Sequence, residues 1–145
     1  NRLIRERLVH KEYLAWIHGK WDGKEKVTLY LKKINDENRV VASKTPKPEH
    51  LTAITEIHPL FYDVGRDREL VRILLHTGRT HQIRVQFAAR KMPLYGDSRY
   101  GGVKGGALGL WSHRLTLPHP ITGKTISAQS DPNWGTAPWS YFKQV

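Results

Sequence analysis

The sequence predicts an α+β fold, built on a largely antiparallel mixed β-sheet with a few short helices. Apolar and polar residues alternate in several segments that are rich in β-branched and aromatic side chains, a pattern typical of strands. Segments of turn-forming residues separate most of them, and hairpin-like connections favour antiparallel pairing. The 145 residues, 39% of them hydrophobic, suffice for one core of ordinary size, so a single domain over residues 1–145 is expected.

The first strands are predicted between residues 9 and 43. β-Branched and aromatic residues over 9–19, ending at a glycine, indicate the first strand. The alternating segments 27–33 and 39–43 flank the turn-forming residues 35–38, and this arrangement predicts a hairpin.

The middle of the chain should add two more strands. Residues 44–50 contain two prolines and are expected to form a loop, after which 51–57 alternates as a strand does. Residues 59–68 contain a glycine and mixed charges and are expected to form a turn. The nearly continuous apolar residues that open segment 70–77 predict a strand that is buried on both faces.

A short helix is expected directly after this buried strand. Gly78 breaks the strand, and Thr80 is a candidate N-cap because its side-chain oxygen can accept a backbone N–H. Ile83 and Phe87 lie four residues apart, so they share one face of the predicted helix.

The ends of the chain are less regular. Residues 1–8 resemble the end of a helix, and 93–106 is too rich in glycine to be regular throughout. A strand over 110–120 stops at its prolines, and a turn and a final strand follow within 121–130. Residues 131–145 carry several aromatic side chains and should form a terminal helical turn that packs back on the sheet.

The charge balance predicts a polyanionic partner. Lys and Arg number 24 against 13 Asp and Glu, which gives a net charge of +11 and a pI near 10.1. Five Trp and six Tyr are interleaved with the basic residues, a combination that suits RNA, whose bases stack on aromatic rings. The alternative is that the rings form the core and the charge only aids solubility.

The composition also excludes several classes of site. The chain has no cysteine, so disulfides and thiolate metal sites are excluded, and a reducing compartment is consistent with this. No apolar segment approaches the roughly 18 residues of a membrane span and no signal peptide is evident, so a cytoplasmic protein without a membrane partner is expected. The eight histidines are scattered without ligand spacing, so no metal site is expected.

Arg84 is the residue with the most specific chemical requirement. It lies between Ile83 and Val85 in the segment Thr77–Val85, and a guanidinium that emerges from partly buried surroundings needs an anion. Arg84 could be a structural residue paired with a carboxylate of its own domain, with Arg79 a surface charge. Alternatively, Arg84 could belong to a functional site.

The segment T-G-R-T-H-Q-I-R-V, followed by P-L-x-G-D-x-x-Y-G, resembles the C-terminal signature of the RluA-type pseudouridine synthases. A K-x-Y-L-A run near residue 13 and a His-Pro pair before a Thr-Gly turn extend the resemblance along nearly the whole chain. The resemblance implies the pseudouridine synthase fold. It also implies an enzyme that isomerises uridine to pseudouridine in ribosomal or transfer RNA with no small-molecule cofactor.

The resemblance also implies roles for individual residues. Arg84 would pair with the family's nucleophilic aspartate, and Tyr13 would stack against the target base, although Tyr13 could equally be a core ring. Further positions would shape the pocket or contact RNA: Arg79, Thr80, His81, Gln82 and Leu94. Gly96 and Asp97 would support that pocket.

The sequence departs from the family pattern at its most important residue. The family's aspartate lies in an H-R-L-D-x-x-T-S-G run, which these 145 residues do not contain. The chain is therefore expected to be the C-terminal portion of a catalytic domain, inactive by itself; the alternative is a non-catalytic RNA-binding module. Arg84 should then be exposed, or satisfied by solvent, a buffer anion or a neighbouring carboxylate. Gln86, where the family usually has histidine, is a smaller departure.

Overall fold

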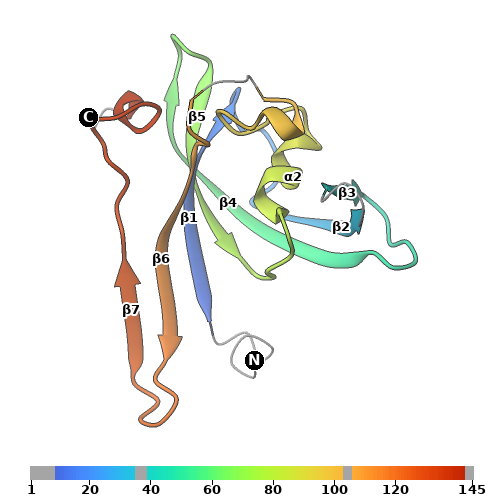
Figure 1. Cartoon of the computed structure of the whole chain (residues 1–145), viewed down its shortest axis with the longest axis vertical. Coiled ribbons are helices and arrows are strands. Elements are labelled where there is room, and N and C mark those ends of the chain that lie inside the picture. The colour runs from blue at the N-terminus through green and yellow to red at the C-terminus, as the bar shows by residue number, and fades with distance from the viewer. Residues whose placement is uncertain (1–8, 35–38, 103–105, 143–145) are drawn as a thin grey trace.

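The computed structural model describes residues 9–34, 39–102 and 106–142, and its main element is a seven-stranded sheet (Figure 1). The order of the strands in the sheet is β3-β2-β4-β5-β1-β6-β7, and every pairing between neighbours is antiparallel. The strands are β1 His10–His18, β2 Lys26–Ile34, β3 Arg39–Ser43, β4 Leu51–Asp63, β5 Arg68–Leu75, β6 Leu110–Pro118 and β7 Thr125–Gln129. The predicted fold class is confirmed.

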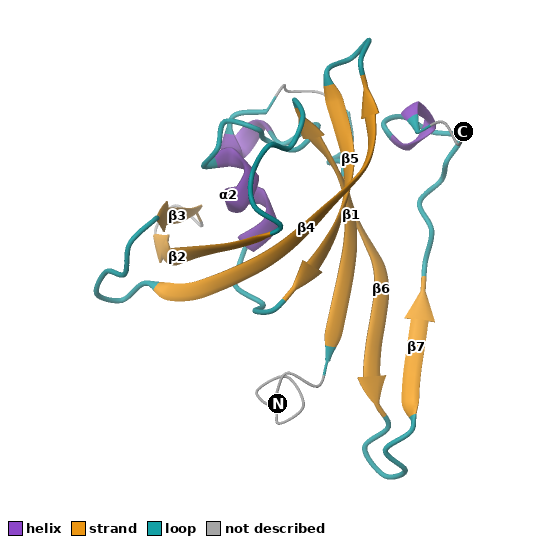
Figure 2. Cartoon of the chain, turned by 180° about the vertical axis from the view of Figure 1, so that it is seen from behind, coloured by secondary structure: helices purple, strands orange, loops and turns teal. Residues whose placement is uncertain are grey.

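The few helices are short and lie on opposite sides of the sheet. Helix α2, Gln82–Ala88, occupies the hollow where the twisted sheet curls around it. The 3₁₀ helix η1, Ser98–Tyr100, lies on the same side, and the 3₁₀ helix η2, Trp139–Tyr141, lies on the other side (Figures 1 and 2). None of the helices in the described ranges is long and apolar enough to cross a membrane.

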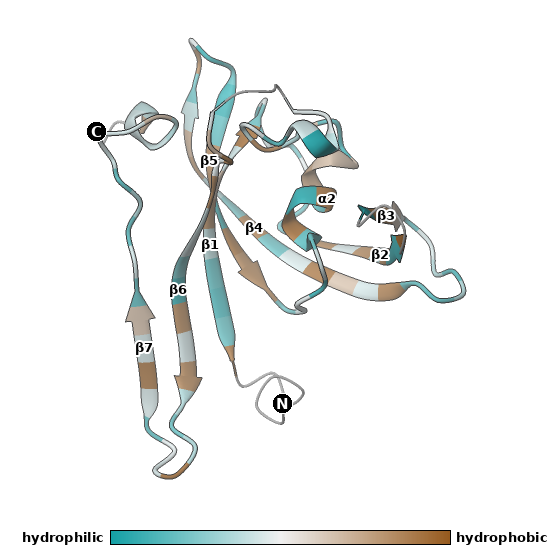
Figure 3. Ribbon diagram, in the orientation of Figure 1, coloured by the Kyte–Doolittle hydropathy of each residue, from teal (hydrophilic) through white to brown (hydrophobic). Residues whose placement is uncertain are grey.

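Alternation along the central strands produces the main core on the α2 side. Successive side chains of a strand point to opposite faces, so one residue in two faces the helix, and Figure 3 shows the resulting change of hydropathy along β4. This cluster comprises Ala15, Ile17, Trp21, Ile57, Val71, Ile73, Ile83, Phe87 and Leu94. The predicted apolar pair, Ile83 and Phe87, therefore joins α2 to the sheet.

A second cluster covers the other face of the sheet. Leu14, Trp16 and Leu70 pack there with Trp139 of η2. Since Leu70 belongs to this cluster while Val71 and Ile73 belong to the first, β5 is buried on both faces, as predicted. The predicted terminal turn that packs back on the sheet is also confirmed.

Two local predictions are wrong. Thr80 is not the N-cap, because His81 takes that position in the left-handed conformation (φ 54°) and makes no side-chain capping bond. The predicted turn over 59–68 is shorter, because β4 continues through Pro59 to Asp63. The strand register shifts between Pro59 and Phe61, and this irregularity accommodates a proline that cannot donate to the ladder. The predictions for residues 1–8 and for the hairpin turn 35–38 lie outside the described residues.

Glu69 is a buried carboxylate in the central strand β5. Its Oε1 accepts the backbone N–H of Trp21 at 2.7 Å, and burial raises the pKa of the carboxyl above its ordinary value of 4.5. The Trp21 hydrogen bond and the charge of Lys20 oppose this rise without cancelling it. Folding therefore makes ionisation of this carboxyl less favourable than it is in the unfolded chain.

We predict that the unfolding free energy falls as pH rises through the range between the ordinary pKa of Glu69 and its higher folded value. Glu69→Gln keeps an acceptor for Trp21 without the charge, so it should remove this pH dependence and raise stability at neutral pH. Urea denaturation across pH 4–8 measures both effects. Glu49→Gln is the matched control: its exposed carboxylate bonds Lys32, so its loss should not stabilise the fold. Destabilisation by Glu69→Gln at neutral pH would contradict the prediction.

Candidate active site

The turn between β5 and α2 is held to β4 by the side chain of Gln82. Its Nε2 donates to Ile54 O at 3.0 Å and to Thr55 Oγ1 at 2.9 Å. Its Oε1 accepts from Thr77 Oγ1 at 2.8 Å and from Arg79 N at 3.1 Å. Gln82 is only 3% exposed, so its side chain fixes the start of α2 and is not available at the surface. Gln82 can therefore contribute to a site only by holding the turn in place, and not by contacting a partner.

Arg79 and Thr80 lie at the surface of this turn. Arg79 donates from Nε to Thr52 O at 2.9 Å, and this bond lays its guanidinium over the end of β4. The side chain of Arg79 remains exposed, as does Thr80. Both residues are therefore accessible to a partner.

His81 and Tyr100 form a hydrogen-bonded pair beside α2. Val40 N donates to Tyr100 Oη at 3.1 Å, and Tyr100 Oη lies 2.7 Å from His81 Nδ1. Burial lowers the pKa of His81, and the charges of Arg84 and Arg99 lower it further. The Tyr100 hydroxyl accepts from Val40 N, and a neutral His81 ring with a free Nδ1 lone pair allows the same hydroxyl to donate to His81.

Arg84 binds Asp97 through two parallel hydrogen bonds. Its Nε donates to Oδ2 at 3.0 Å and its Nη2 to Oδ1 at 2.8 Å, while the Asp97 side chain has no exposed surface. Asp97 raises the pKa of the guanidinium further. The interpretation of Arg84 as the partner of a carboxylate of its own domain is thus confirmed.

The turn that delivers Asp97 requires glycine. Gly96 has a φ of 74°, and a Cβ added there would lie 2.5 Å from Ala107 O. The Arg84 guanidinium also lies over the Tyr100 ring at 5.0 Å. Tyr100 is a residue that sequence reasoning left without a role, although it is the tyrosine of the P-L-x-G-D-x-x-Y-G motif.

Asp97 occupies only some of the N–H donors of the Arg84 guanidinium. Nη1 and the second hydrogen of Nη2 have no hydrogen-bond acceptor within the described ranges, and the side chain is 21% exposed. An arginine carries five N–H donors, so Arg84 can bind a second anion while it holds Asp97.

Tyr13 lies in β1 on the same face of the sheet as α2. Its half-buried ring packs against the main core cluster, as the interpretation of a core ring expected. Across the described residues, its hydroxyl makes no hydrogen bond. The ring is therefore anchored while its polar end remains available.

Leu94 lines a pocket with a volume of about 310 Å³. Leu94 itself is buried and forms an isolated β-bridge with Ile17 of β1. Three basic side chains, those of His18, Arg68 and Lys91, line the pocket, and no carboxylate of the described residues does. Sequence reasoning missed these three residues, because they come from separate elements and share no spacing along the chain.

Comparison with known proteins identifies the family. Residues 1–89 match the family model described as RNA pseudouridylate synthase. The chain belongs to this family. It is 32% identical over 152 residues to a tRNA pseudouridine synthase C of Haemophilus influenzae, covering 90% of this chain and 63% of the relative. It is 30% identical over 141 residues to a ribosomal large subunit pseudouridine synthase D of Vibrio cholerae, covering 86% of this chain and 42% of the relative.

Solved structures show the same fold. Human RNA Pseudouridylate Synthase Domain Containing 1 superposes with a TM-score of 0.70 at 24% identity, covering 92% of this chain and 58% of the human one. Human RNA Pseudouridylate Synthase Domain Containing 4 gives a TM-score of 0.72 at 18% identity, covering 97% and 63%. The chain therefore spans about two thirds or less of the length of the relatives and structures named here.

We predict that Tyr100→Phe destabilises the fold by about 1–3 kcal/mol, because the buried Val40 N–H loses its acceptor. The unfolding free energy from urea denaturation measures this loss. Tyr30→Phe is the matched control, since the half-buried Tyr30 has no hydrogen bond in the part of the chain that the structure describes. Equal effects of the two substitutions would contradict the assigned role of the Tyr100 hydroxyl.

Proposed function

We propose that this chain is the C-terminal portion of the catalytic domain of an RNA pseudouridine synthase. The whole protein would isomerise uridine to pseudouridine in ribosomal or transfer RNA in the cytoplasm, with a nucleophilic aspartate supplied by a segment outside these 145 residues. The observation that carries the proposal is the partly used guanidinium of Arg84, which Asp97 orients and leaves with free N–H donors.

In the proposed mechanism Arg84 is the binding site for that aspartate. An N–H donor and a positive charge next to a carboxylate lower its pKa, so the aspartate would stay ionised and able to attack. Asp97 contributes by fixing the plane of the guanidinium, because both of its oxygens are engaged. The role of Asp97 is thus positioning.

Tyr13 is proposed to contact the target uridine. Its ring is held by the core on the α2 side of the sheet, and its hydroxyl is unbonded within the described residues. An aromatic ring held in this way can stack on a base that has been extruded from an RNA helix. The free hydroxyl could then act on a proton of that base.

RNA as the partner is supported by unpaired positive charge. Lys91 has no ion-pair partner in the described ranges, and Arg68, whose guanidinium lies 4.7 Å from the centre of the Tyr95 ring, has none there either. These residues line the pocket that also borders Tyr100, which contacts Arg84. A phosphate bound there would lie close to the proposed active site, with Arg79, Thr80 and His81 at the neighbouring turn.

A non-catalytic RNA-binding module is the second candidate. Two observations favour it: Arg84 already has a carboxylate partner, and these 145 residues do not contain the H-R-L-D run. Tritium release from [5-³H]uridine-labelled RNA by the longer protein decides between the candidates. Release supports the synthase, whereas binding of RNA without release supports the module.

We predict that Arg84→Lys in the longer protein lowers the isomerisation rate by about 100-fold or more, because a lysine cannot hold Asp97 bidentately and still present a donor in a fixed direction. Tyr13→Phe, which keeps the ring, should lower the rate while RNA binding persists. Arg66→Lys, in the exposed turn after β4, is the control and should leave the rate unchanged. Full activity of Arg84→Lys, with circular dichroism showing an intact fold, would exclude the assigned role of Arg84.

We predict that Arg68→Ala combined with Lys91→Ala weakens RNA binding by about tenfold or more and reduces the slope of log affinity against log salt concentration by about 2. Fluorescence anisotropy with a labelled RNA at several salt concentrations measures both quantities. Lys124→Ala, near the exposed tip of the β6–β7 hairpin, should change affinity less. An unchanged salt slope in the double variant would show that the pocket binds no phosphate.

A further inference from the structure

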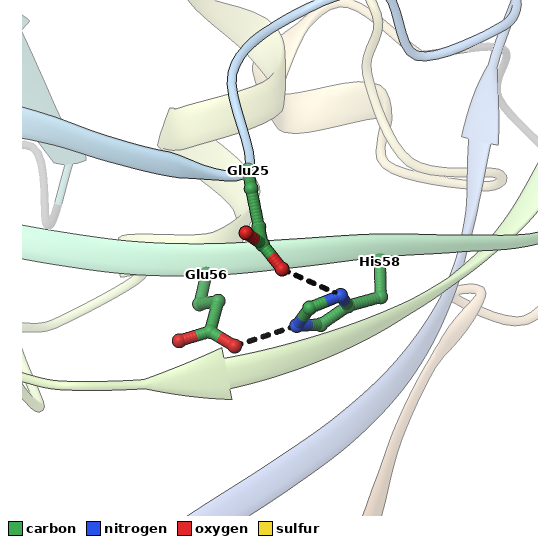
Figure 4. A group of neighbouring side chains, drawn as sticks. All are labelled: Glu25, Glu56 and His58. Carbon is green, nitrogen blue, oxygen red and sulfur yellow. Dashed lines mark hydrogen bonds and ion pairs between the residues drawn. The ribbon is translucent and has the colours of Figure 1, made fainter.

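Three potential metal ligands converge on the face of the sheet opposite α2. His58 Nε2 lies 2.6 Å from Glu56 Oε2, and His58 Nδ1 lies 3.1 Å from Glu25 Oε1 (Figure 4). One ligand atom from each of the three residues can be chosen so that all lie within 4.8 Å of one another. The group is separate from Arg84, Asp97 and the basic pocket.

The sheet itself brings these residues together. Glu56 and His58 are two residues apart on β4, so their side chains share one face. Glu25 directly precedes β2, whose first residue Lys26 is paired with Glu56. The bond from Ile57 N to Glu25 O, 2.7 Å long, holds the chain at that point. The backbone positions are therefore fixed before any ligand binds.

A fourth residue orients the central carboxylate. His76, directly after β5, places Nε2 at 2.9 Å from Glu56 Oε1, the oxygen that does not face His58. Carboxylates that bind metals are commonly held in this way by an outer hydrogen-bond partner. Arg72, the cross-strand neighbour of His58, directs Nη1 to Glu12 at 3.0 Å, so its charge is compensated outside the group.

We propose that Glu25, Glu56 and His58 form a Zn²⁺ site, with His76 as the positioning residue for Glu56. Imidazole nitrogen and carboxylate oxygen bind Zn²⁺ at about 2.0–2.2 Å, and tetrahedral geometry places ligand atoms about 3.4 Å apart. The separations of 2.6 and 3.1 Å involve different ring nitrogens of His58, so the ring has to turn until one nitrogen faces both carboxylates. The three ligand atoms already lie within 4.8 Å of one another, so this adjustment is confined to side chains. One ring nitrogen of His58 and one oxygen from each glutamate would supply three ligands, and a water would complete the tetrahedron.

Charge and access are consistent with a cation at this position. With neutral histidines the group carries two negative charges, which one Zn²⁺ balances. The side chains of Glu56 and His58 are 19% and 26% exposed, and that of Glu25 is 67% exposed, so the ion can enter from solvent past Glu25. The spacing of the histidines along the sequence did not predict this metal site, because one of its three ligands, Glu25, comes from the segment before β2.

Isothermal titration of the metal-free protein with ZnCl₂ tests the proposal. We expect one equivalent bound, with affinity at least tenfold lower in His58→Gln and in Glu56→Gln, and a smaller loss in His76→Gln. His10→Gln is the matched control, because His10 is an exposed strand histidine with no partner in the described part of the chain. Absence of binding, or equal affinity in His58→Gln and wild type, would overturn the proposal.

A second readout separates metal binding from stability. Co²⁺ bound at a tetrahedral nitrogen and oxygen site gives an intense visible absorption, which we expect in the wild type and in His10→Gln but not in His58→Gln. The absorption should also disappear when Zn²⁺ is added in competition. Co²⁺ absorption that persists in a folded His58→Gln variant would place the ion elsewhere.

Discussion

A carboxylate with no exposed surface needs a compensating charge, and Arg84 supplies it to Asp97 through two parallel hydrogen bonds. The pair connects α2 to the loop that follows it. The same loop is tied to β1 by the bridge from Leu94 to Ile17, and to β3 by the bond from Val40 to the Tyr100 hydroxyl. The ion pair therefore links the position of α2 to the position of the loop.

This arrangement also determines what Arg84 can do chemically. Asp97 engages only one edge of the guanidinium, so the pair leaves a fixed donor surface that is partly open to solvent. A lone arginine on a short helix would lose much of its binding energy in becoming ordered, whereas Arg84 is ordered before an anion arrives. The charge that stabilises the fold is thus available to a nucleophile or a phosphate, and the pseudouridine synthase proposal uses it in this way.

The sequence predicted the elements of this fold better than their arrangement. Alternation identified strands such as β2 and β4, because one face of each is buried. The apolar composition of 70–75 correctly indicated burial on both faces. Neither pattern predicted the order of the strands in the sheet, in which β1 lies between β5 and β6. Thr80 failed as an N-cap because the Gln82 side chain, reaching back to Arg79, already holds the turn.

For the candidate site, the sequence likewise predicted individual residues better than their contacts. That Arg84 needs an anion follows from its apolar neighbours, and a neighbouring carboxylate was among the expected partners. The roles of Tyr100 and of the basic pocket, and the convergence of Glu25 with His58, depend on contacts between distant segments. Such contacts leave no periodic trace in one sequence, so only the folded chain reveals them.

A double-mutant cycle on Arg84 and Asp97 tests the central claim most directly. Unfolding free energies are measured for wild type, Arg84→Met, Asp97→Asn and the double variant. The account predicts that the double variant is less destabilised than the sum of the single variants by about 2 kcal/mol, because removing either partner alone leaves the other uncompensated. Additivity within about 0.5 kcal/mol would show that the pair does not hold the helix and the loop together.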